Sequence, residues 1–210
     1  MADDLKYGYK GAEPTQSFGS NTGVFDPNDI NNLIADNKWT TFGQLELIET
    51  QNITGVSSTT FTSLGNYNVH FLTVNDFQPV TDGTDLRIRF ISNGTEYTGS
   101  TYDYAYQYGT SGGSFSEVKS ATATYLRATF NTGNATNEKG NSYTYFYNLI
   151  DSTKYSFTTH HISLLAGNSA FNMAFGSGVQ TNAVAMDTIK LYNDSGNFTA
   201  TASLYGIRYS

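Results

Sequence analysis

Hydrophobic and polar residues alternate along most of this chain with a period of two, which is typical of β-strands. The alternation is clearest where Leu86, Ile88 and Phe90 are predicted to face the interior. Arg87 and Arg89 lie between them and are predicted to face solvent. Strands are predicted in the same way, from alternation and from runs of β-branched and aromatic residues, at residues 39–49, 52–61, 68–77, 85–91, 102–108, 121–130, 142–149, 155–165, 166–178, 187–192 and 198–209.

Turn signals separate the predicted strands. Asp82-Gly83 and Asn93-Gly94 are dipeptides that favour tight hairpin turns. The stretch 68–77 is apolar on both faces, which favours a central strand between two layers. Because no helical period interrupts these strands, the body is predicted to be all-β, an antiparallel β-sandwich of jelly-roll type. Polar loops are predicted at residues 109–116, 131–141 and 194–197.

One short helix is predicted ahead of the body. Asp26 suits the N-cap and Pro27 suits the first helical position, because the N–H that proline lacks would be unpaired there. Apolar residues then recur at the spacing of one helix face. A helix this short needs a partner to pack against. It is predicted to cover about residues 27–36 and to carry an apolar stripe made of Ile30, Leu33 and Ile34.

The segment before the helix, residues 1–22, follows neither period and would be disordered by itself. Chain ends fray unless something ties them down, so we expect a neighbouring subunit to hold this arm; the alternative is that it folds back on its own body. The chain is therefore divided into an attachment arm, residues 1–38, and a β-sandwich domain, residues 39–210. The side chains expected in attachment or subunit contacts are Tyr7, Tyr9, Phe18, Val24, Phe25, Ile30, Leu33, Ile34 and Trp39.

The amino-acid composition supports the prediction of an all-β fold and restricts the classes of partner that the chain is expected to bind. The 210 residues include 16 Tyr, 14 Phe and 20 Gly but only 3 Pro, which favours strands joined by tight turns. The net charge of −7 argues against binding to a phosphate backbone, so no nucleic acid is expected. There is no cysteine, and no apolar run approaches the length of a membrane span. We expect no membrane insertion.

The sequence contains no convincing catalytic set, so the chain is predicted not to be an enzyme, and neither a cofactor nor a metal is expected. His160 and His161 are adjacent on a predicted strand, so their rings point to opposite faces and cannot bind one metal together. Asp82 and Asp85 flank a turn, and turn chemistry explains Asp82 without a calcium site.

Tyrosines recur at every second position in two predicted strands, which places the rings of each ladder on one sheet face. Three roles stay open for such ladders: packing in the core, a subunit interface, where tyrosine is enriched, and stacking against sugar rings. A glycan site would use the first ladder. The first ladder consists of Tyr102, Tyr104, Tyr106 and Tyr108, and the second of Tyr143, Tyr145 and Tyr147.

Three motifs resemble elements of the virion proteins of tailed bacteriophages. Residues 22–33, TGVFDPNDINNL, lead to Lys38-Trp39 and resemble a G-V-[FW]-x-x-x-[DE] element that precedes a β-rich body in those proteins. Residues 76–86, DFQPVTDGTDL, are similar to a P-x-T-D-G-x-x-L hairpin. Residues 202–207, ASLYGI, are similar to a terminal Leu-Tyr-Gly-Ile strand.

This resemblance implies a non-enzymatic virion protein of the short tail-fibre, appendage or capsid-decoration type. Its arm would dock onto tail or capsid subunits, and its sandwich would project. A homo-oligomer is implied, with a trimer favoured, located in the virion after assembly in the host cytoplasm. The chain has no collagen-like or coiled-coil shaft, so it is not a long fibre by itself. The alternative is a host-surface glycan-binding module used in host attachment.

Overall fold

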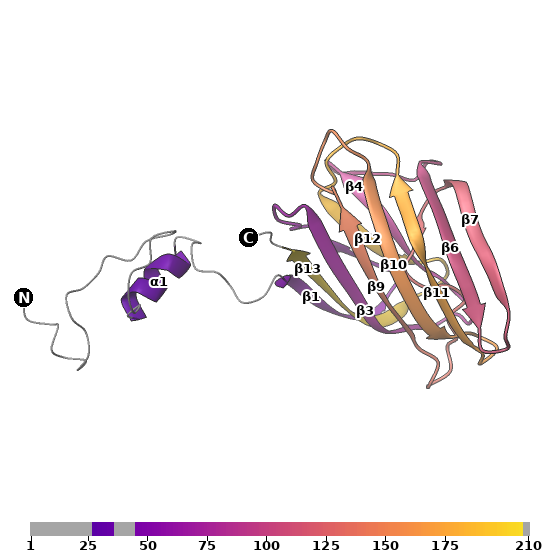
Figure 1. Cartoon of the computed structure of the whole chain (residues 1–210). Helices are drawn as coiled ribbons and strands as arrows, with labels where there is room; N and C mark the ends of the chain where they lie inside the picture. Colours follow the sequence, from indigo (N-terminus) through magenta and orange to yellow (C-terminus); the bar gives the residue numbers. More distant parts are fainter. Residues whose placement is uncertain (1–26, 36–44, 208–210) are drawn as a thin grey trace, which may run out of the picture. The chain divides into compact units, whose positions relative to one another are not determined.

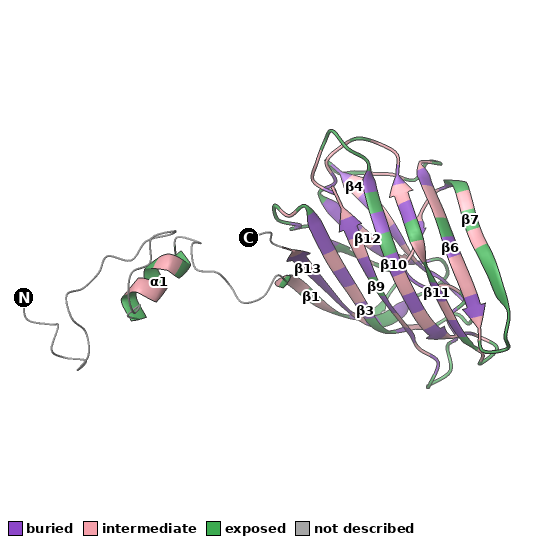
Figure 2. Ribbon diagram, viewed as in Figure 1, coloured by how far each residue is buried: buried purple, intermediate pink, exposed green. Residues whose placement is uncertain are grey.

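The computed structural model describes residues 27–35 and 45–207, which belong to two separate compact units (Figure 1). In the first unit, helix α1 spans Pro27–Ala35, so the predicted helix is confirmed. It carries Asp29 in its first turn, where the helix dipole favours an anion. None of its residues is buried (Figure 2).

The second unit is an antiparallel sandwich of two sheets, as predicted. The larger sheet has eight strands. In spatial order they are β1 (Leu45–Val56), β13 (Phe198–Ile207), β3 (Val69–Pro79), β9 (Gly140–Tyr147), β10 (Ser156–Leu165), β11 (Phe171–Gln180), β6 (Tyr102–Thr110) and β7 (Phe115–Ala123).

The smaller sheet has five strands, and the chain crosses between the two sheets repeatedly: β1 and β3 belong to the larger sheet, and β2 and β4 to the smaller. In spatial order the smaller sheet contains β2 (Ser58–Phe61), β12 (Thr188–Asn193), β4 (Leu86–Ser92) and β5 (Thr95–Glu96), and β8 (Leu126–Arg127) also pairs with β4.

The main core lies between the sheets and follows the predicted alternation. Leu86, Ile88 and Phe90 of β4 are fully buried, while the arginines between them point outward. Phe90 packs edge-on against Phe146 of β9 with the ring centroids 5.9 Å apart. Burial of each such side chain contributes on the order of 2 kcal/mol. The predicted central position of β3 is confirmed, because it lies between β13 and β9. A layer on each side of it was predicted as well, but the second sheet covers only one side and Phe71 lies on the other.

A second, smaller core lies against β10 and β11 of the larger sheet. There the inner face of β10 and β11 is covered by the segment 124–132, which contains β8. Phe130 packs against Ile162, Leu164 and Ala174. Gly178 of β11 is needed at this point, because a Cβ there would lie 2.6 Å from a methyl carbon of Leu126. The segment 124–132 therefore takes the place of a covering strand.

Several predicted boundaries were wrong, chiefly at the edge strands β1 and β7. The predicted strand 52–61 is divided between β1 and β2, and β6 extends into the predicted loop as far as Thr110. The predicted break between strands at residues 50–51 does not exist, because β1 continues through it to Val56. Residues 115–116 were predicted as loop and 121–130 as one strand. In the structure β7 begins at Phe115 and ends at Ala123, and only Leu126–Arg127 of the remainder forms a strand. Most positions of β7 are exposed, so it lacks the alternation that reveals a half-buried strand.

Candidate interaction surface

The two tyrosine ladders, which have the same period in the sequence, face opposite sides of the larger sheet. Register fixes this assignment, because residues paired across antiparallel strands share a face. Tyr106 pairs with Gly176, Gly176 with His160, and His160 with Thr144. The adjacent residue Tyr145 therefore lies on the other face. The first ladder faces the interior of the sandwich, and the second faces outward.

The first ladder is built into the core. Tyr102 is fully buried, and its hydroxyl donates to the Tyr97 carbonyl at 3.1 Å and accepts the Phe90 N–H at 3.0 Å. The rings of Tyr104 and Tyr106 stack with centroids 4.8 Å apart. Burial raises the pKa values of Tyr102 and Tyr106.

This placement corrects the expectation that the whole first ladder offers rings to a sugar. Tyr102 is 0% exposed and Tyr106 is 4% exposed, so neither presents a face to solvent. Tyr104 is half-buried and packs against the core. Tyr108, also half-buried, meets Phe130 edge-on at 5.0 Å between ring centroids. Of the three roles left open by the sequence, core packing describes most of this ladder.

The second ladder belongs to a continuous aromatic cluster on the outside of the sheet. Phe71 of β3 lies at its centre, with its ring centroid 4.6 Å from Tyr145, 6.0 Å from Tyr143 and 6.1 Å from Tyr205. His161 packs beside Tyr143 at 5.6 Å. Four neighbouring strands, β13, β3, β9 and β10, thus contribute rings that pack against one another across the sheet.

Register extends this cluster over most of the sheet. Leu47 pairs with Tyr205, Phe157 with Tyr147, and Phe175 with His161, all on the outward side. We call the complete set the outer aromatic face. It consists of Leu45, Leu47, Phe71, Tyr143, Tyr145, Tyr147, Phe157, His161, Phe171, Phe175 and Tyr205.

The outer aromatic face is large and uncharged. β9, β10, β11 and β13 contain no Asp, Glu, Lys or Arg. Tyr143, Phe157, Phe171 and Phe175 are 43–48% exposed, which corresponds to about 100 Å² each for aromatic side chains. These four alone expose about 400 Å², within the range of the largest apolar patch on a typical monomer. Leu45 and Leu47, which are 50% and 59% exposed, enlarge it further.

The outside of the smaller sheet has the opposite character. Arg87 lies over the Tyr125 ring at 4.0 Å, and Arg89 over the Tyr192 ring at 4.7 Å, distances typical of cation–π contacts. Glu96 accepts from Arg89 at 3.0 Å and from Lys190 at 2.7 Å. Burial raises the pKa of Glu96, but these two cations outweigh it and hold the pKa below its usual value.

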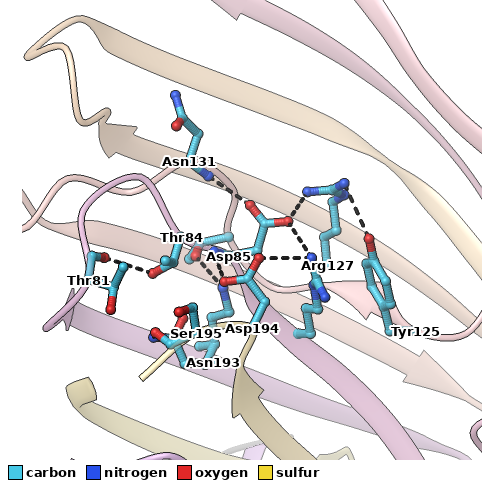
Figure 3. A network of polar contacts seen from close by, with 12 residues as sticks. Thr81, Thr84, Asp85, Tyr125, Arg127, Asn131, Asn193, Asp194 and Ser195 are labelled. Atoms are coloured by element: carbon cyan, nitrogen blue, oxygen red, sulfur yellow. Dashed lines mark hydrogen bonds and ion pairs between the residues drawn. The ribbon is translucent and has the colours of Figure 1, made fainter. Parts of the chain in front are cut away.

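An ionic network continues from this sheet into the turns beside it (Figure 3). Asp85 is buried and accepts hydrogen bonds from Arg127, from Arg87 at 3.4 Å and from the Asn131 N–H at 2.9 Å. Asp194 accepts from Arg87 at 2.8 Å and from the Asp85 N–H at 3.0 Å. The network ties the segment 124–132 to β4, which is how that segment is held over the larger sheet.

The structure also places the histidines and the other side chains considered for chemistry. His160 and His161 lie on opposite faces of β10, as predicted. His70 is buried in the core, with its Nε2 2.8 Å from the Leu64 carbonyl oxygen. Within residues 27–35 and 45–207, no three His, Cys, Asp or Glu side chains are grouped as a metal site would require. In the same ranges no helix is long and apolar enough to cross a membrane.

The predicted attachment residues are only partly within the described chain. Ile30 and Leu33 are half-exposed on α1, and Ile34 is 53% exposed, so the helix has an apolar stripe that its own turns do not cover. The remaining predicted attachment residues lie outside the described residues; they are Tyr7, Tyr9, Phe18, Val24, Phe25 and Trp39.

Sequence reasoning missed the exposed aromatic side chains outside the ladders, chiefly Phe71, Phe157 and Phe175. The signal was present as alternation, but alternation alone does not tell which side of a strand faces solvent. A scan against models of known protein families finds no match to this chain, and a search of curated proteins finds none either.

Proposed function

We propose that this chain is a non-enzymatic structural protein of a tailed-bacteriophage virion, an appendage or decoration that assembles through its outer aromatic face. The observation that carries the proposal is a broad aromatic surface without charge on a chain whose net charge is −7. Isolated exposed apolar residues are ordinary, whereas the largest contiguous apolar patch on a protein surface is often a functional site.

The occupant that we propose for this face is a second copy of the same chain. An uncharged face meets its own copy without bringing like charges together, although the chain as a whole is acidic. Its aromatic composition is that of an interface core, which is enriched in Tyr and Phe and depleted in charge. Together with Leu45, Leu47 and the half-buried rings, the area approaches the roughly 800 Å² that each partner buries in a standard interface. A trimer is favoured, because the virion proteins that this chain resembles are commonly threefold.

We also infer a jelly-roll topology for the sandwich, supported by the strand order. β1, β13, β3 and β9 follow one another in the larger sheet, and β2, β12 and β4 in the smaller. From β1 to β4, successive strands alternate between the larger and the smaller sheet. In this scheme β6, β7, β10 and β11 extend the larger sheet. Jelly rolls occur in viral capsid proteins and in lectins, so the topology agrees with the proposal by analogy of fold.

The self-association of the sandwich is tested by native mass spectrometry of three proteins. The wild type is expected to be a homo-oligomer. The double variant Tyr143→Lys, Phe175→Lys places two charges on the outer aromatic face and is expected to be monomeric. The control Val80→Lys adds a charge at a site that is 67% exposed, in the turn after β3, and should leave the oligomer intact. A wild type that is monomeric at micromolar concentration would contradict the proposed interface.

The role of the arm is tested separately, in assembled particles. Removal of residues 1–38 is expected to abolish incorporation into virions, while the truncated chain still forms the oligomer. Incorporation of the truncated chain would contradict attachment through the arm and would leave the interface proposal standing. The two experiments therefore distinguish attachment from self-association.

A further inference from the structure

The larger sheet ends at the edge strand β7, which pairs with β6 on one side and with no strand of the described chain on the other (Figure 1). In an antiparallel pair, alternate residues direct their N–H and C=O groups away from the partner strand. On an edge strand these groups are available to another chain. We propose that β7 pairs, antiparallel, with β7 of a second copy of this chain, so that the larger sheet continues from one copy into the next.

Of the two edges of this sheet, β7 is the one suited to pairing. Residues 115–120 follow β6 without a register shift, and the one irregularity of the pair comes after Ser120. β1, at the opposite edge, contains two register shifts, and such bulges twist an edge strand and hinder its pairing. β1 also carries two glutamates and no basic residue, so it has no cation to offer to a copy of itself.

The order of charges along β7 favours its own copy as the partner. Glu117 and Lys119 are its charged residues, and they flank Val118. When two antiparallel copies are centred on Val118, Glu117 of each copy lies opposite Lys119 of the other. Opposite charges in this position stabilise a strand pair, whereas like charges destabilise it. A pairing centred on Glu117 or on Lys119 would place two like charges opposite each other, so the charges select both the partner and the register.

Both charged side chains are available for this contact. They lie on the outer side of the sheet, because Glu117 pairs with Gln107 and Gln107 with Phe175. In the single chain the Lys119 Nζ lies 2.7 Å from the Glu117 Oε2, and both side chains are largely exposed. An ion pair this exposed adds little stability. Its exchange for two pairs between the copies therefore costs little, while the free backbone groups gain hydrogen bonds.

Phe115 adds an apolar contact at each end of the paired stretch. It is the first residue of β7 and is 69% exposed. With Val118 at the centre, Phe115 lies opposite Ala121 of the second copy, whose small side chain leaves room for the ring. On the inner side of the sheet, the half-buried Val118 meets Val118 of the second copy. The edge pairing thus covers a ring that the single chain leaves in water.

The edge contact uses a different surface from the outer aromatic face, so it does not rest on the proposed function. Because opposite residues share a face, the pairing turns the outer aromatic faces of both copies to the same side. One pair of short edge strands buries far less than the roughly 1,200 Å² of a stable interface. Two free chains are therefore expected to separate at micromolar concentration, and repetition of the edge in an oligomer would strengthen the contact by avidity.

Disulfide trapping tests the edge contact, because the chain has no cysteine of its own. In the proposed register, Val118→Cys places the two Cα atoms about 4.5–5.5 Å apart, within the range that a disulfide spans. Under mild oxidation at submillimolar protein and low salt, this variant is expected to form covalent dimers at least tenfold faster than Val80→Cys. Val80 is the control because it lies in an exposed turn. Equal rates in the two variants would overturn the proposal.

The register is tested with two further cysteines. Ser116 lies opposite Ser120 of the second copy when the pairing is centred on Val118. Ser116→Cys and Ser120→Cys are each expected to dimerise slowly alone and at least fivefold faster as an equimolar mixture. Dimers that form as readily from either variant alone would overturn the register. This comparison also replaces the first test if Val118→Cys does not fold.

The role of the charges is tested in the Val118→Cys chain. Adding Lys119→Glu places glutamates opposite each other and is expected to slow dimer formation at least fivefold. Adding Glu117→Lys as well restores opposite charges and should restore the rate; a rate that stays low would overturn the charge argument.

The edge contact is separated from the outer aromatic face in one further chain, which combines Val118→Cys with Tyr143→Lys and Phe175→Lys. Dimer trapping is expected to persist in it, because the two lysines lie away from the edge. Loss of trapping would show that the cysteines meet only through the aromatic face, and would overturn the edge contact. A wild type without oligomers in native mass spectrometry would contradict the proposed interface of that face and leave the edge contact standing.

Discussion

Tyr106 and His160 meet edge-on inside the sandwich, with their ring centroids 4.8 Å apart and their planes at 70°. His160 is 2% exposed, and neither of its ring nitrogens has a partner in the described part of the chain. Burial lowers its pKa from 6.5 to about 3. The imidazole is therefore neutral in the folded protein and packs as a core side chain. Its protonation would place an unpaired charge in the core.

This burial predicts that the sandwich becomes less stable in mild acid. Above pH 6.5 the ring is neutral in both the folded and the unfolded state, so the full stability is present. Between pH 6.5 and about 3 only the unfolded state binds the proton, and the free energy of unfolding falls by about 1.4 kcal/mol per pH unit. His70, whose pKa is also lowered by burial, adds to this slope. Urea unfolding at a series of pH values measures it.

Variants of the two adjacent histidines separate the contribution of His160 from the rest. His160→Leu is expected to reduce the slope below pH 6.5, because a buried leucine does not titrate. His161→Leu is the matched control, since its ring lies on the outer aromatic face, and it should leave most of the slope in place. Equal slopes in the wild type and in His160→Leu would contradict this explanation.

A second prediction concerns the close approach of β6 and β11. A Cβ at Gly176 would collide with the Ala105 carbonyl oxygen and would lie 2.7 Å from the Tyr106 Cα. Since both are backbone atoms, the strands themselves would have to shift. We expect Gly176→Ala to cost about 2–3 kcal/mol of unfolding free energy in urea titrations. Gly99→Ala is the control, because no heavy atom lies within 4 Å of a Cβ placed there; similar losses in both variants would refute the packing argument.

A third prediction concerns the ionic network around Asp85. Asp85→Asn keeps the shape of the side chain but removes the carboxylate that Arg127 and Arg87 share. The Asp85 side chain is only 11% exposed, so water cannot replace the lost ion pairs well. We expect a loss of about 2–4 kcal/mol in unfolding free energy, since breaking a buried pair leaves an uncompensated charge. Glu117→Gln breaks the fully exposed pair with Lys119 and should have no measurable effect. A change of Asp85→Asn that is as small as that of the control would show that the network adds little stability.

A fourth prediction concerns independent folding of the sandwich. Both groups of buried hydrophobic residues lie within residues 45–207. A chain that begins at residue 45 is therefore expected to unfold cooperatively on heating, with nearly the midpoint of the full chain, as circular dichroism would record. Loss of a cooperative transition would mean that the preceding residues form part of the core.

The strand content could be predicted because it depends on local alternation. In β4 the inward residues are apolar and the outward residues Arg87 and Arg89 are charged, so one strand alone reveals both its type and its orientation. β7 could not be predicted in this way, because an edge strand exposed on both sides has no preferred pattern. In β1 a bulge between Leu47 and Glu49 changes the register, so the alternation is interrupted inside a continuous strand.

The orientation of the candidate surface could not be predicted, because β10 carries both apolar and polar residues on each of its sides. Its inward side chains include Ser156, Thr158 and His160, while Phe157 on the outward side is 47% exposed. Ile162 and Leu164 are also inward, so hydrophobicity alone does not choose between the two orientations of this strand. Its orientation follows from its pairing with β9 and β11. Those two strands pair in turn with β3 and β6, which are remote in sequence. For the same reason two tyrosine ladders with the same period face opposite sides of the sheet.

The two outer surfaces of the sandwich differ, because one is aromatic and uncharged and the other carries ion pairs. The two sides of a subunit are therefore not equivalent in an assembly. An array that buries the aromatic side must turn the arginine- and glutamate-bearing side of β4 and β12 toward its surroundings. In the proposed oligomer, an inverted copy would expose apolar rings and bury charges, so that orientation is disfavoured.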